Sequence, residues 1–325
     1  MKTDTGERIV KIITEKGKVT VKEMVELLNI SRQGLFLQIA KLMRRGEIAK
    51  VGKSPRVYYF IPEKRERNVS FILDKKTTEF VNNRYLYISP LGEKLEGLPG
   101  FEEWCRKTNQ EVAKTAGEYM LTQKRYDKWV NGGVISGMVK IKNTFPKVYL
   151  DELFYLDFYS IERFGKTKLG QLLLYAKQSQ SREIIHEIVM SVKKKIDKLI
   201  VKYQIESVGF IPPTVKREVQ LMGELERELA LPLRIVKIRK IRTELMVPQK
   251  TLSHLSDRVE NAKKTMIVEM KDVHNNILLI DDAVGSGATL NETAKQIRER
   301  GICRGKIIGL AITGSFKGFD VISEV

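Results

Sequence analysis

The sequence predicts an α/β protein: a parallel sheet flanked by helices, preceded by a small unit of helices and a hairpin and by a helical connector. Three observations favour this fold. From residue 147 onward, short apolar runs alternate with amphipathic helical patterns, which is typical of a parallel sheet covered by helices. Residues 1–62 read as three helices and a hairpin. Residues 63–146 begin as a charged linker and continue mainly as helix.

Composition narrows the class of protein. A chain of 325 residues favours two or three domains, and 42% hydrophobic residues suffice for packed cores. No apolar run approaches the ~20 residues that a membrane crossing needs. Two cysteines, Cys105 and Cys303, are too few for a disulfide framework or a zinc site, so we expect a cytoplasmic protein. The net charge of +18 favours anionic partners such as nucleic acids or phosphorylated ligands.

The first unit has clear helix and hairpin signals. Helices are predicted over residues 7–15, 21–28 and 31–45, with Ser31 as the N-cap of the third and Gly46 as its end. Residues 47–51 and 56–61 alternate as the strands of a hairpin around residues 52–55. Three helices and a hairpin in this order resemble a winged helix-turn-helix domain, which we assign to residues 1–62.

That resemblance implies binding to double-stranded DNA, with the third helix in the major groove and the hairpin at the backbone. Residues 1–66 hold 15 Lys or Arg and 8 Asp or Glu, a net charge of +7. A winged helix used only for protein contacts is the alternative. A two-fold DNA site would require a homodimer. The candidate DNA-binding residues are Ser31, Arg32, Gln33, Gln38, Lys41, Lys53 and Arg56.

The connector, residues 63–146, is predicted to contain one long helix from Pro99 to about Trp129, ended by the glycines that follow. It is rich in aromatic residues, which suit either packing in a core or stacking on bases. Their helical spacing favours the core. The aromatic residues concerned are Tyr85, Tyr87, Trp104, Tyr119, Tyr126 and Trp129.

The region from residue 147 to residue 325 carries the α/β pattern. Residues 169–177 read as a helix or a strand, and residues 237–258 as a basic stretch with few core signals. Helices are predicted over residues 181–203 and 215–229, and strands over residues 207–212, 233–238, 265–269, 277–280 and 306–313.

The motif that organises this region follows the strand 277–280. Asp281 and Asp282 stand at the strand's carboxyl end, glycines make a compact loop, and Thr289 opens a helix. Glycines let backbone N–H groups approach a phosphate, and the helix N-terminus adds positive potential. Paired carboxylates suit a ribose diol or a hydrated Mg²⁺. The alternative is an ordinary strand, turn and helix with two exposed aspartates. A Walker A loop is a weaker interpretation, because no Lys follows the last glycine.

Residues 277–290 resemble the phosphoribosyl pyrophosphate (PRPP) motif of type I phosphoribosyltransferases. The resemblance implies that the acidic pair holds the ribose hydroxyls, that the loop holds the 5′-phosphate, and that Mg²⁺ accompanies PRPP, with Asp281 and Asp282 as its candidate protein ligands. The chain has Gly285-Ser286 where the family usually has Thr-Thr, so one hydroxyl is missing. The implied PRPP-binding residues are Asp281, Asp282, Ala283, Val284, Gly285, Ser286, Gly287, Ala288 and Thr289.

A wider resemblance, over residues 147–314, is to the ComF branch of this family. The matching residues include Ile211-Pro212-Pro213, Gln220 and an ordered series through residues 239–261, although the chain lacks ComF's Cys-rich zinc segment. A winged helix joined to such a domain is also similar to the purine repressor of Gram-positive bacteria. Basic residues of this region that the resemblance places near pyrophosphate are Lys177, Arg217, Arg239, Arg242 and Arg258.

Three functions therefore stay open. The protein is a PRPP-responsive DNA-binding regulator, an active phosphoribosyltransferase that releases pyrophosphate, or a ComF-like factor in DNA uptake or handling. The sequence identifies no catalytic residue, since its three histidines, His186, His254 and His274, follow no acid–base pattern.

Overall fold

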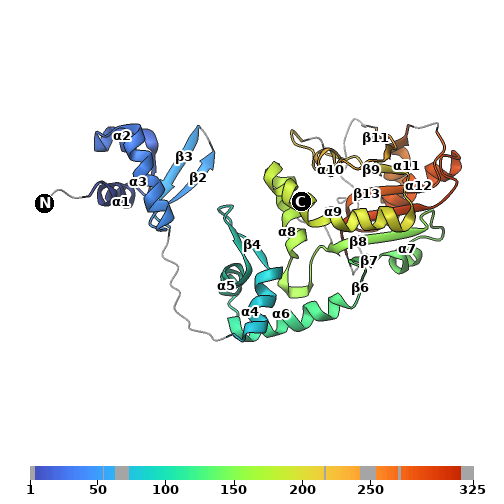
Figure 1. The fold of residues 1–325 in the computed structure, drawn as a ribbon, viewed down its shortest axis with the longest axis horizontal. Coiled ribbons are helices and arrows are strands. Elements are labelled where there is room, and N and C mark those ends of the chain that lie inside the picture. The colour runs from blue at the N-terminus through green and yellow to red at the C-terminus, as the bar shows by residue number, and fades with distance from the viewer. Residues whose placement is uncertain are drawn as a thin grey trace. The chain divides into compact units, whose positions relative to one another are not determined.

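The computed structural model describes residues 4–53, 55–62, 73–215, 217–241, 254–269 and 272–315. The chain divides into two compact units, Met1–Phe71 and Ile72–Val325, each of which has its own core (Figure 1). Within these segments, no helix combines the length and apolar character required to cross a bilayer.

The first unit contains the three helices and the hairpin expected from the sequence. Ile9, Met24 and Leu35, one from each helix, are fully buried at its centre. A short strand before the second helix joins the hairpin, so that the antiparallel sheet has the order β1-β3-β2. The elements are α1 Thr5–Lys16, β1 Lys18–Thr20, α2 Val21–Leu28, α3 Arg32–Arg44, β2 Ala49–Lys53 and β3 Arg56–Phe60.

Local side-chain bonds fix where α2 and α3 begin. Thr20 Oγ1 accepts a hydrogen bond from the amide of Glu23, whose carboxylate accepts one from the Thr20 amide at 2.7 Å. This reciprocal pair satisfies two amides that a helix N-terminus leaves free. Ser31 Oγ accepts from the Gly34 amide at 3.2 Å, which confirms Ser31 as the N-cap of α3.

The second unit is built on a seven-stranded sheet of order β10-β9-β13-β14-β8-β7-β6. The five strands from β10 to β8 are parallel, as predicted, but β7 and β6 run antiparallel at one edge. The sheet is therefore mixed, and it begins before residue 147. The strands are β6 Val130–Asn131, β7 Val134–Ser136, β8 Glu152–Phe158, β9 Ser207–Phe210, β10 Arg234–Ile235, β13 Ile277–Val284 and β14 Ile307–Gly314.

Helices cover both faces of this sheet (Figure 1). On one face, Leu278 and Ile280 of β13 share a core with α8, α9 and α10. On the other, Ile277 and Leu279 share a core with α7, α11 and α12. Apolar residues on both sides of one strand explain its continuous hydrophobic run. The helices are α7 Met138–Thr144, α8 Lys168–Ser179, α9 Arg182–Tyr203, α10 Leu221–Leu229, α11 Leu255–Thr265 and α12 Ala288–Glu299.

The prediction of one long helix from Pro99 to Trp129 is wrong. The chain forms two helices, because Thr108 Oγ1 bonds back to the Trp104 carbonyl and Asn109 adopts a left-handed conformation with φ of 53°. Asn tolerates this conformation better than most residues. The elements here are α4 Lys75–Arg84, β4 Leu86–Ile88, β5 Lys94–Glu96, α5 Gly97–Lys107 and α6 Val112–Asp127.

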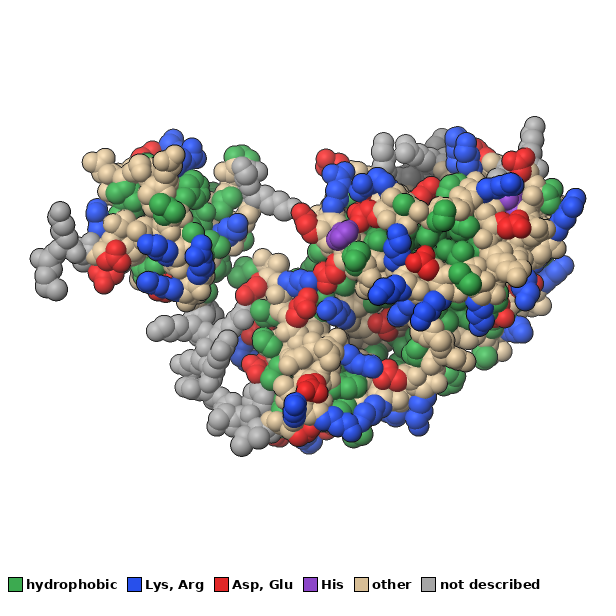
Figure 2. Space-filling view, in the orientation of Figure 1, with side chains coloured by type: hydrophobic (Ala, Val, Ile, Leu, Met, Phe, Trp, Pro, Cys, Tyr) green, Lys and Arg blue, Asp and Glu red, His purple; other side chains and the backbone are tan. Residues whose placement is uncertain are grey.

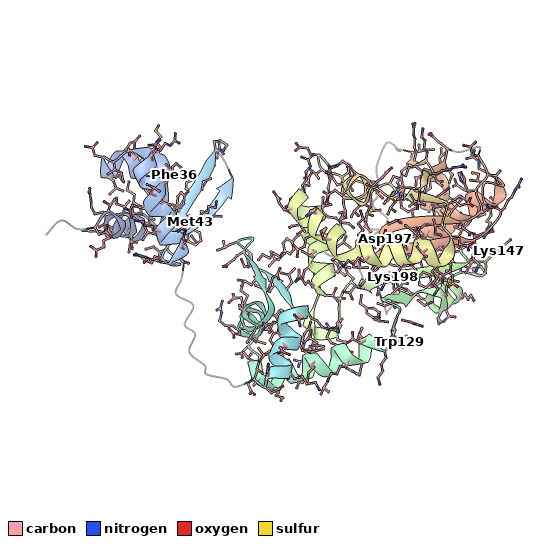
Figure 3. All side chains as sticks on the ribbon, viewed as in Figure 1. Phe36, Met43, Trp129, Lys147, Asp197 and Lys198 are labelled. Atoms are coloured by element: carbon pink, nitrogen blue, oxygen red, sulfur yellow. The ribbon has the colours of Figure 1, made fainter. Side chains whose placement is uncertain are left out.

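The aromatic residues of this region mostly pack with one another, as their spacing indicated. Tyr85 and Tyr119 are buried, and the Tyr85 ring meets that of Phe101 edge-on, with centroids 4.9 Å apart. Trp129 is the exception, since 56% of it is exposed (Figure 3).

Three other boundaries differ from those predicted. Residues 169–177 belong to a helix, α8. Helix α10 begins only at Leu221, because the Gln220 side chain donates to the carbonyls of Val215 and Arg217 and holds the chain before the helix in a non-helical conformation. The strand predicted over residues 233–238 is divided between β10 and β11 Ile238–Lys240, and β11 pairs outside the main sheet with β12 Met266–Val268.

We expect Leu279→Ala to lower the free energy of unfolding of the second unit by ~2–5 kcal/mol, because Leu279 is fully buried in the central strand and truncation leaves a cavity. Urea denaturation followed by circular dichroism measures this. Leu91→Ala, at a position 63% exposed, is the matched control and should change stability by less than about 0.5 kcal/mol. Equal effects of the two substitutions would contradict the assigned core.

Candidate functional site

The acidic pair lies at the carboxyl end of β13, between β9 and β14. The strand is longer than predicted and includes both aspartates. Asp281 Oδ1 accepts a hydrogen bond from the Asp282 amide at 2.8 Å. Asp282 Oδ2 forms an ion pair of 2.8 Å with Lys177 Nζ of α8. Lys177 therefore neutralises the acidic pair and is not a free cation.

The loop after β13 makes the tight turn that the glycines predicted. Gly287 has φ of +84° and caps α12, and a Cβ atom there would come within 3.1 Å of the Ile141 side chain. The backbone conformation therefore favours glycine, and a larger residue would also crowd Ile141. Ser286 is buried, and its hydroxyl accepts from the Ala288 amide at 3.3 Å. This hydroxyl is already engaged with the loop itself.

A cavity of about 200 Å³ opens beside the acidic pair and the start of α12. Four of the nine predicted PRPP-binding residues line it, namely Asp281, Asp282, Ala283 and Thr289. The remaining five, Val284, Gly285, Ser286, Gly287 and Ala288, form the turn between these two sides. The wall opposite comes from the loop after β9, residues 211–220, and from β11.

Two further cations line this cavity. Lys240 donates to Thr214 Oγ1 at 2.7 Å, and burial lowers the pKa of its ammonium group, an effect that the charge of Asp281 opposes. Arg217 has a buried Nη1 that forms no hydrogen bond within the described residues. A buried N–H without a partner is costly, so this guanidinium provides a place for an anionic ligand.

The predicted basic residues divide between those that reach the cavity and those that do not. Lys177 and Arg217 line it. Arg239 instead pairs at 2.9 Å with Glu269, which directly follows β12, and is largely exposed. Arg258, in α11, lies close to the loop, since a Cβ on Gly285 would be 3.5 Å from its Nη1. Arg242 falls outside the described residues.

Sequence reasoning missed Lys240 and Thr214, which both line the cavity. The signal for Lys240 was the alternation of side chains along a strand. Arg239 and Lys240 are neighbours in β11, so they point to opposite faces, and only one of the two can reach the cavity. The sequence predicts this strand at residues 233–238, before Arg239 and Lys240, so the alternation of these two side chains is not apparent from the sequence alone.

The acidic pair is electrostatically strained. Burial raises the pKa of Asp281 to about 7, and the charge of Asp282 adds to this effect. The Asp282 amide, Lys177 and Lys240 act in the opposite direction. A ligand that donates hydrogen bonds to these carboxylates would relieve part of the cost of burying them.

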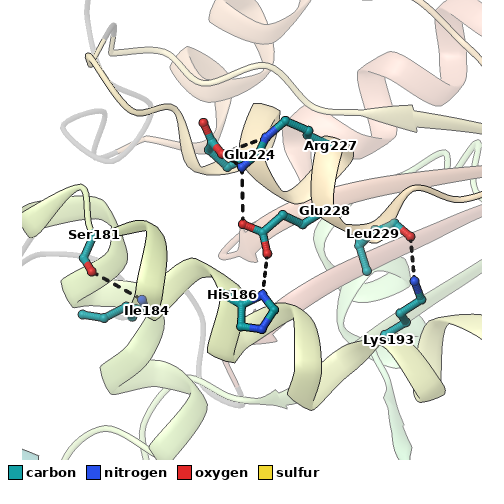
Figure 4. Close-up of polar contacts among 8 residues, drawn as sticks. All are labelled: Ser181, Ile184, His186, Lys193, Glu224, Arg227, Glu228 and Leu229. Atoms are coloured by element: carbon teal, nitrogen blue, oxygen red, sulfur yellow. Dashed lines mark hydrogen bonds and ion pairs between the residues drawn. The ribbon is translucent and has the colours of Figure 1, made fainter.

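Helices α9 and α10 hold one wall of the cavity in place (Figure 4). His186 of α9 lies 2.9 Å from the carboxylate of Glu228 in α10, and Lys193 Nζ donates to the Leu229 carbonyl at 3.1 Å. Arg227 contacts both Glu224 and Glu228. These bonds attach α10 to α9, and the residues at the start of α10, Leu221 and Met222, line the cavity.

In the first unit, the candidate DNA-binding residues lie mainly on α3. Arg32, Gln33 and Lys41 are exposed, Gln38 is half-buried, and Ser31 caps the helix. Lys53 and Arg56 are paired residues of the hairpin, and Arg56 is exposed. The same helix also exposes two apolar residues that the sequence did not single out, Phe36 (Figure 3) at 47% and Leu37 at 67% exposure.

Comparisons with known proteins add little. No protein-family model matches the chain, and no curated protein matches it. Among solved structures, it is similar to the crystal structure of adenine phosphoribosyltransferase from Leishmania tarentolae, with 15% identity and a TM-score of 0.26 over 49% of this chain and 90% of that one. A likeness at this level carries no argument about function. The second unit is a mixed α/β fold with a sheet rich in parallel strands.

We expect the stability of the second unit to depend on the ionisation of Asp281. The pKa of Asp281 is raised above its ordinary value of 3.8, so the folded state favours the protonated carboxyl group. The stability that this group contributes is fully present below about pH 4 and is lost as the pH rises through about 7. Asp281→Asn, which stays neutral, should flatten this dependence. Urea denaturation between pH 4 and pH 8, with Asp197→Asn on the exposed surface of α9 as control, measures it. A wild-type slope in Asp281→Asn would contradict the assignment.

Proposed function

We propose that the second unit binds PRPP, or a related ribose phosphate, in the cavity beside Asp281 and Asp282, and that the protein is a PRPP-responsive DNA-binding regulator. One observation supports the proposal that the second unit binds PRPP. The acidic pair, the start of α12 after a glycine turn, and the cations Arg217 and Lys240 meet at a single cavity. Acceptors for a sugar diol and donors for phosphates are therefore within reach of one ligand.

Each part of PRPP has a complementary group. The ribose hydroxyls donate to Asp281 and Asp282. The 5′-phosphate accepts from the amides of the loop 285–289, where the helix N-terminus adds positive potential. The pyrophosphate meets Arg217 and Lys240. Lys177 shares Asp282 with the ligand or moves toward a phosphate as it enters.

Mg²⁺ fits this arrangement as a companion of the ligand. The oxygens of Asp281 and Asp282 are the donors that Mg²⁺ prefers, but Lys177 already occupies one side of the pair. We infer that the ion is held mainly by the pyrophosphate, with the aspartates as further ligands. When bound, it would neutralise phosphate charge.

Replacing both aspartates should remove PRPP binding. We expect Asp281→Asn with Asp282→Asn to weaken PRPP at least tenfold, because each charge-assisted hydrogen bond contributes about 1.5–3 kcal/mol. Isothermal titration calorimetry in Mg²⁺ buffer measures the affinity. Asp197→Asn, an acid on the exposed surface of α9, serves as control and should leave it unchanged. Wild-type affinity in the double variant would exclude this cavity.

An active phosphoribosyltransferase is the second candidate, and it is favoured by the two cations opposite the acidic pair. Arg217 and Lys240 are placed where they would stabilise pyrophosphate as it leaves C1 of the ribose. A coupled assay of pyrophosphate release from PRPP, across a panel of bases and amines, separates the candidates. Turnover supports the transferase, and binding without turnover supports the regulator.

The DNA-binding part of the proposal is supported by the first unit. Three short helices and a hairpin, with Arg32, Gln33 and Lys41 exposed on the third helix, would allow α3 to enter a major groove. Figure 2 shows that Lys and Arg side chains are spread over the visible face of the second unit and are not gathered in one patch. Two copies of the chain on a two-fold DNA site would explain sequence recognition.

We expect Arg32→Ala with Lys41→Ala to weaken binding to a double-stranded DNA pool and to flatten its salt dependence, because each lost phosphate contact removes about 0.9 from the slope. Fluorescence anisotropy at several salt concentrations measures both quantities. Lys11→Ala with Lys16→Ala, on α1, removes the same charge as a control. If both double variants lose the same affinity, α3 has no special part in binding.

Regulation itself is tested by linkage between the two ligands. If PRPP with Mg²⁺ shifts the affinity for DNA by ~5–150-fold, DNA must shift the affinity for PRPP by the same factor. Anisotropy titrations with and without saturating PRPP measure this. An unchanged DNA affinity would refute the regulatory part of the proposal while leaving PRPP binding intact.

A further inference from the structure

A second cavity, of about 300 Å³, lies at the carboxyl end of β8 and shares no lining residue with the first. We propose that it binds a free α-amino acid. Its walls come from α4, α6, the segment around β8, and the helices α8 and α9. The lining residues used below are Arg84, Gln123, Asp127, Asp157, Lys168 and Lys195.

The charged groups of this cavity are paired except for two. Arg84 Nη1 donates to Asp127 Oδ1 at 2.7 Å, and Lys168 Nζ lies 3.3 Å from Glu96. Asp157 and Lys195 form no ion pair with each other or with any other described residue, although the charge of Lys195 acts on Asp157. The cavity thus offers one carboxylate and one ammonium group that are close but not in contact.

The hydrogen-bonding capacity left at these two groups matches a zwitterion. Asp157 Oδ1 accepts from the Phe158 amide at 2.7 Å, and the Thr167 side chain also stabilises the carboxylate, which still has further lone pairs. Lys195 Nζ donates to the Leu156 carbonyl at 3.1 Å, which leaves two N–H groups. An α-amino acid places its ammonium group at Asp157 and its carboxylate at Lys195, so that both charges are satisfied.

Gln123 adds a second acceptor for the ligand's ammonium group. It is buried on α6, and its Nε2 donates to the Tyr119 hydroxyl at 2.9 Å. This bond leaves the carbonyl oxygen of its amide free to accept. Burial also raises the pKa of Asp157 to about 6, even though the charges of Lys195 and Arg84 act in the opposite direction.

The remaining lining selects the side chain of the ligand. Phe158 and Ile161 are buried apolar residues, and the Phe158 ring meets that of Tyr126 edge-on at 4.9 Å. These residues favour an amino acid with an apolar side chain, because its burial is favourable and a second charge would have no partner.

Titration of the full chain with each of the twenty L-α-amino acids tests the proposal. Calorimetry and the rise in unfolding temperature report binding. We expect an amino acid with an apolar side chain to bind. Its amine without the carboxylate, and its acid without the amino group, should each bind at least tenfold more weakly. Failure of every amino acid to bind, or equal binding of the truncated analogues, would overturn the proposal.

Two variants locate the site. Asp157→Asn and Lys195→Met should each weaken the amino acid about tenfold or more, while Lys198→Met, exposed on the same helix, should not (Figure 3). Asp157→Asn is isosteric, and the raised pKa of Asp157 means that the fold accepts a neutral group there. Unchanged unfolding curves in the absence of ligand show that each variant is folded. Wild-type affinity in both site variants would assign the binding to another place.

Discussion

The burial of two adjacent carboxylates at the end of the central strand is the constraint on which the site depends. Asp281 and Asp282 are half-buried, Lys177 pairs with one of them, and Lys240 lies near the other. Desolvation still raises the pKa of Asp281, so the fold retains a cost at this point. Such an arrangement is typical of a binding site, where a ligand supplies the missing donors.

The position of β13 within the sheet explains why polar groups converge there. Its neighbours β9 and β14 are parallel to it, so the segments after these strands all leave at the same edge. The loop after β9 bends back across that edge and is held by the bonds of the Gln220 side chain. The pair β11 and β12 lies outside the sheet and brings Lys240 to the cavity.

The second cavity follows from the same topology. Asp157 of β8 is in register with Thr313 of β14, which is in register with Ala283 of β13. Both cavities therefore lie at the carboxyl edge of one sheet, two strands apart. They differ in the elements that close them. Helices α4 and α6 precede the sheet in the chain and close the second cavity, whereas the segment 211–222 closes the first.

What the sequence by itself determined was local. Helix caps such as Ser31, the glycine turn at Gly287 and the buried strand 277–280 depend on neighbours a few residues away, so their patterns are visible in the chain. The break at Asn109 is also local, but helical periodicity continued across it and concealed it.

Only the tertiary structure decided which charged residues meet. Lys177 and Asp282 are far apart in sequence, and their ion pair depends on how α8 packs against the sheet. The choice of Lys240 over Arg239 depends on the direction of one short strand. Asp157 and Lys195 showed no pattern at all, because the elements that bring them together, α4, α6, β8, α8 and α9, are far apart in the chain. Pairings of this kind follow from packing, which no single stretch of sequence encodes.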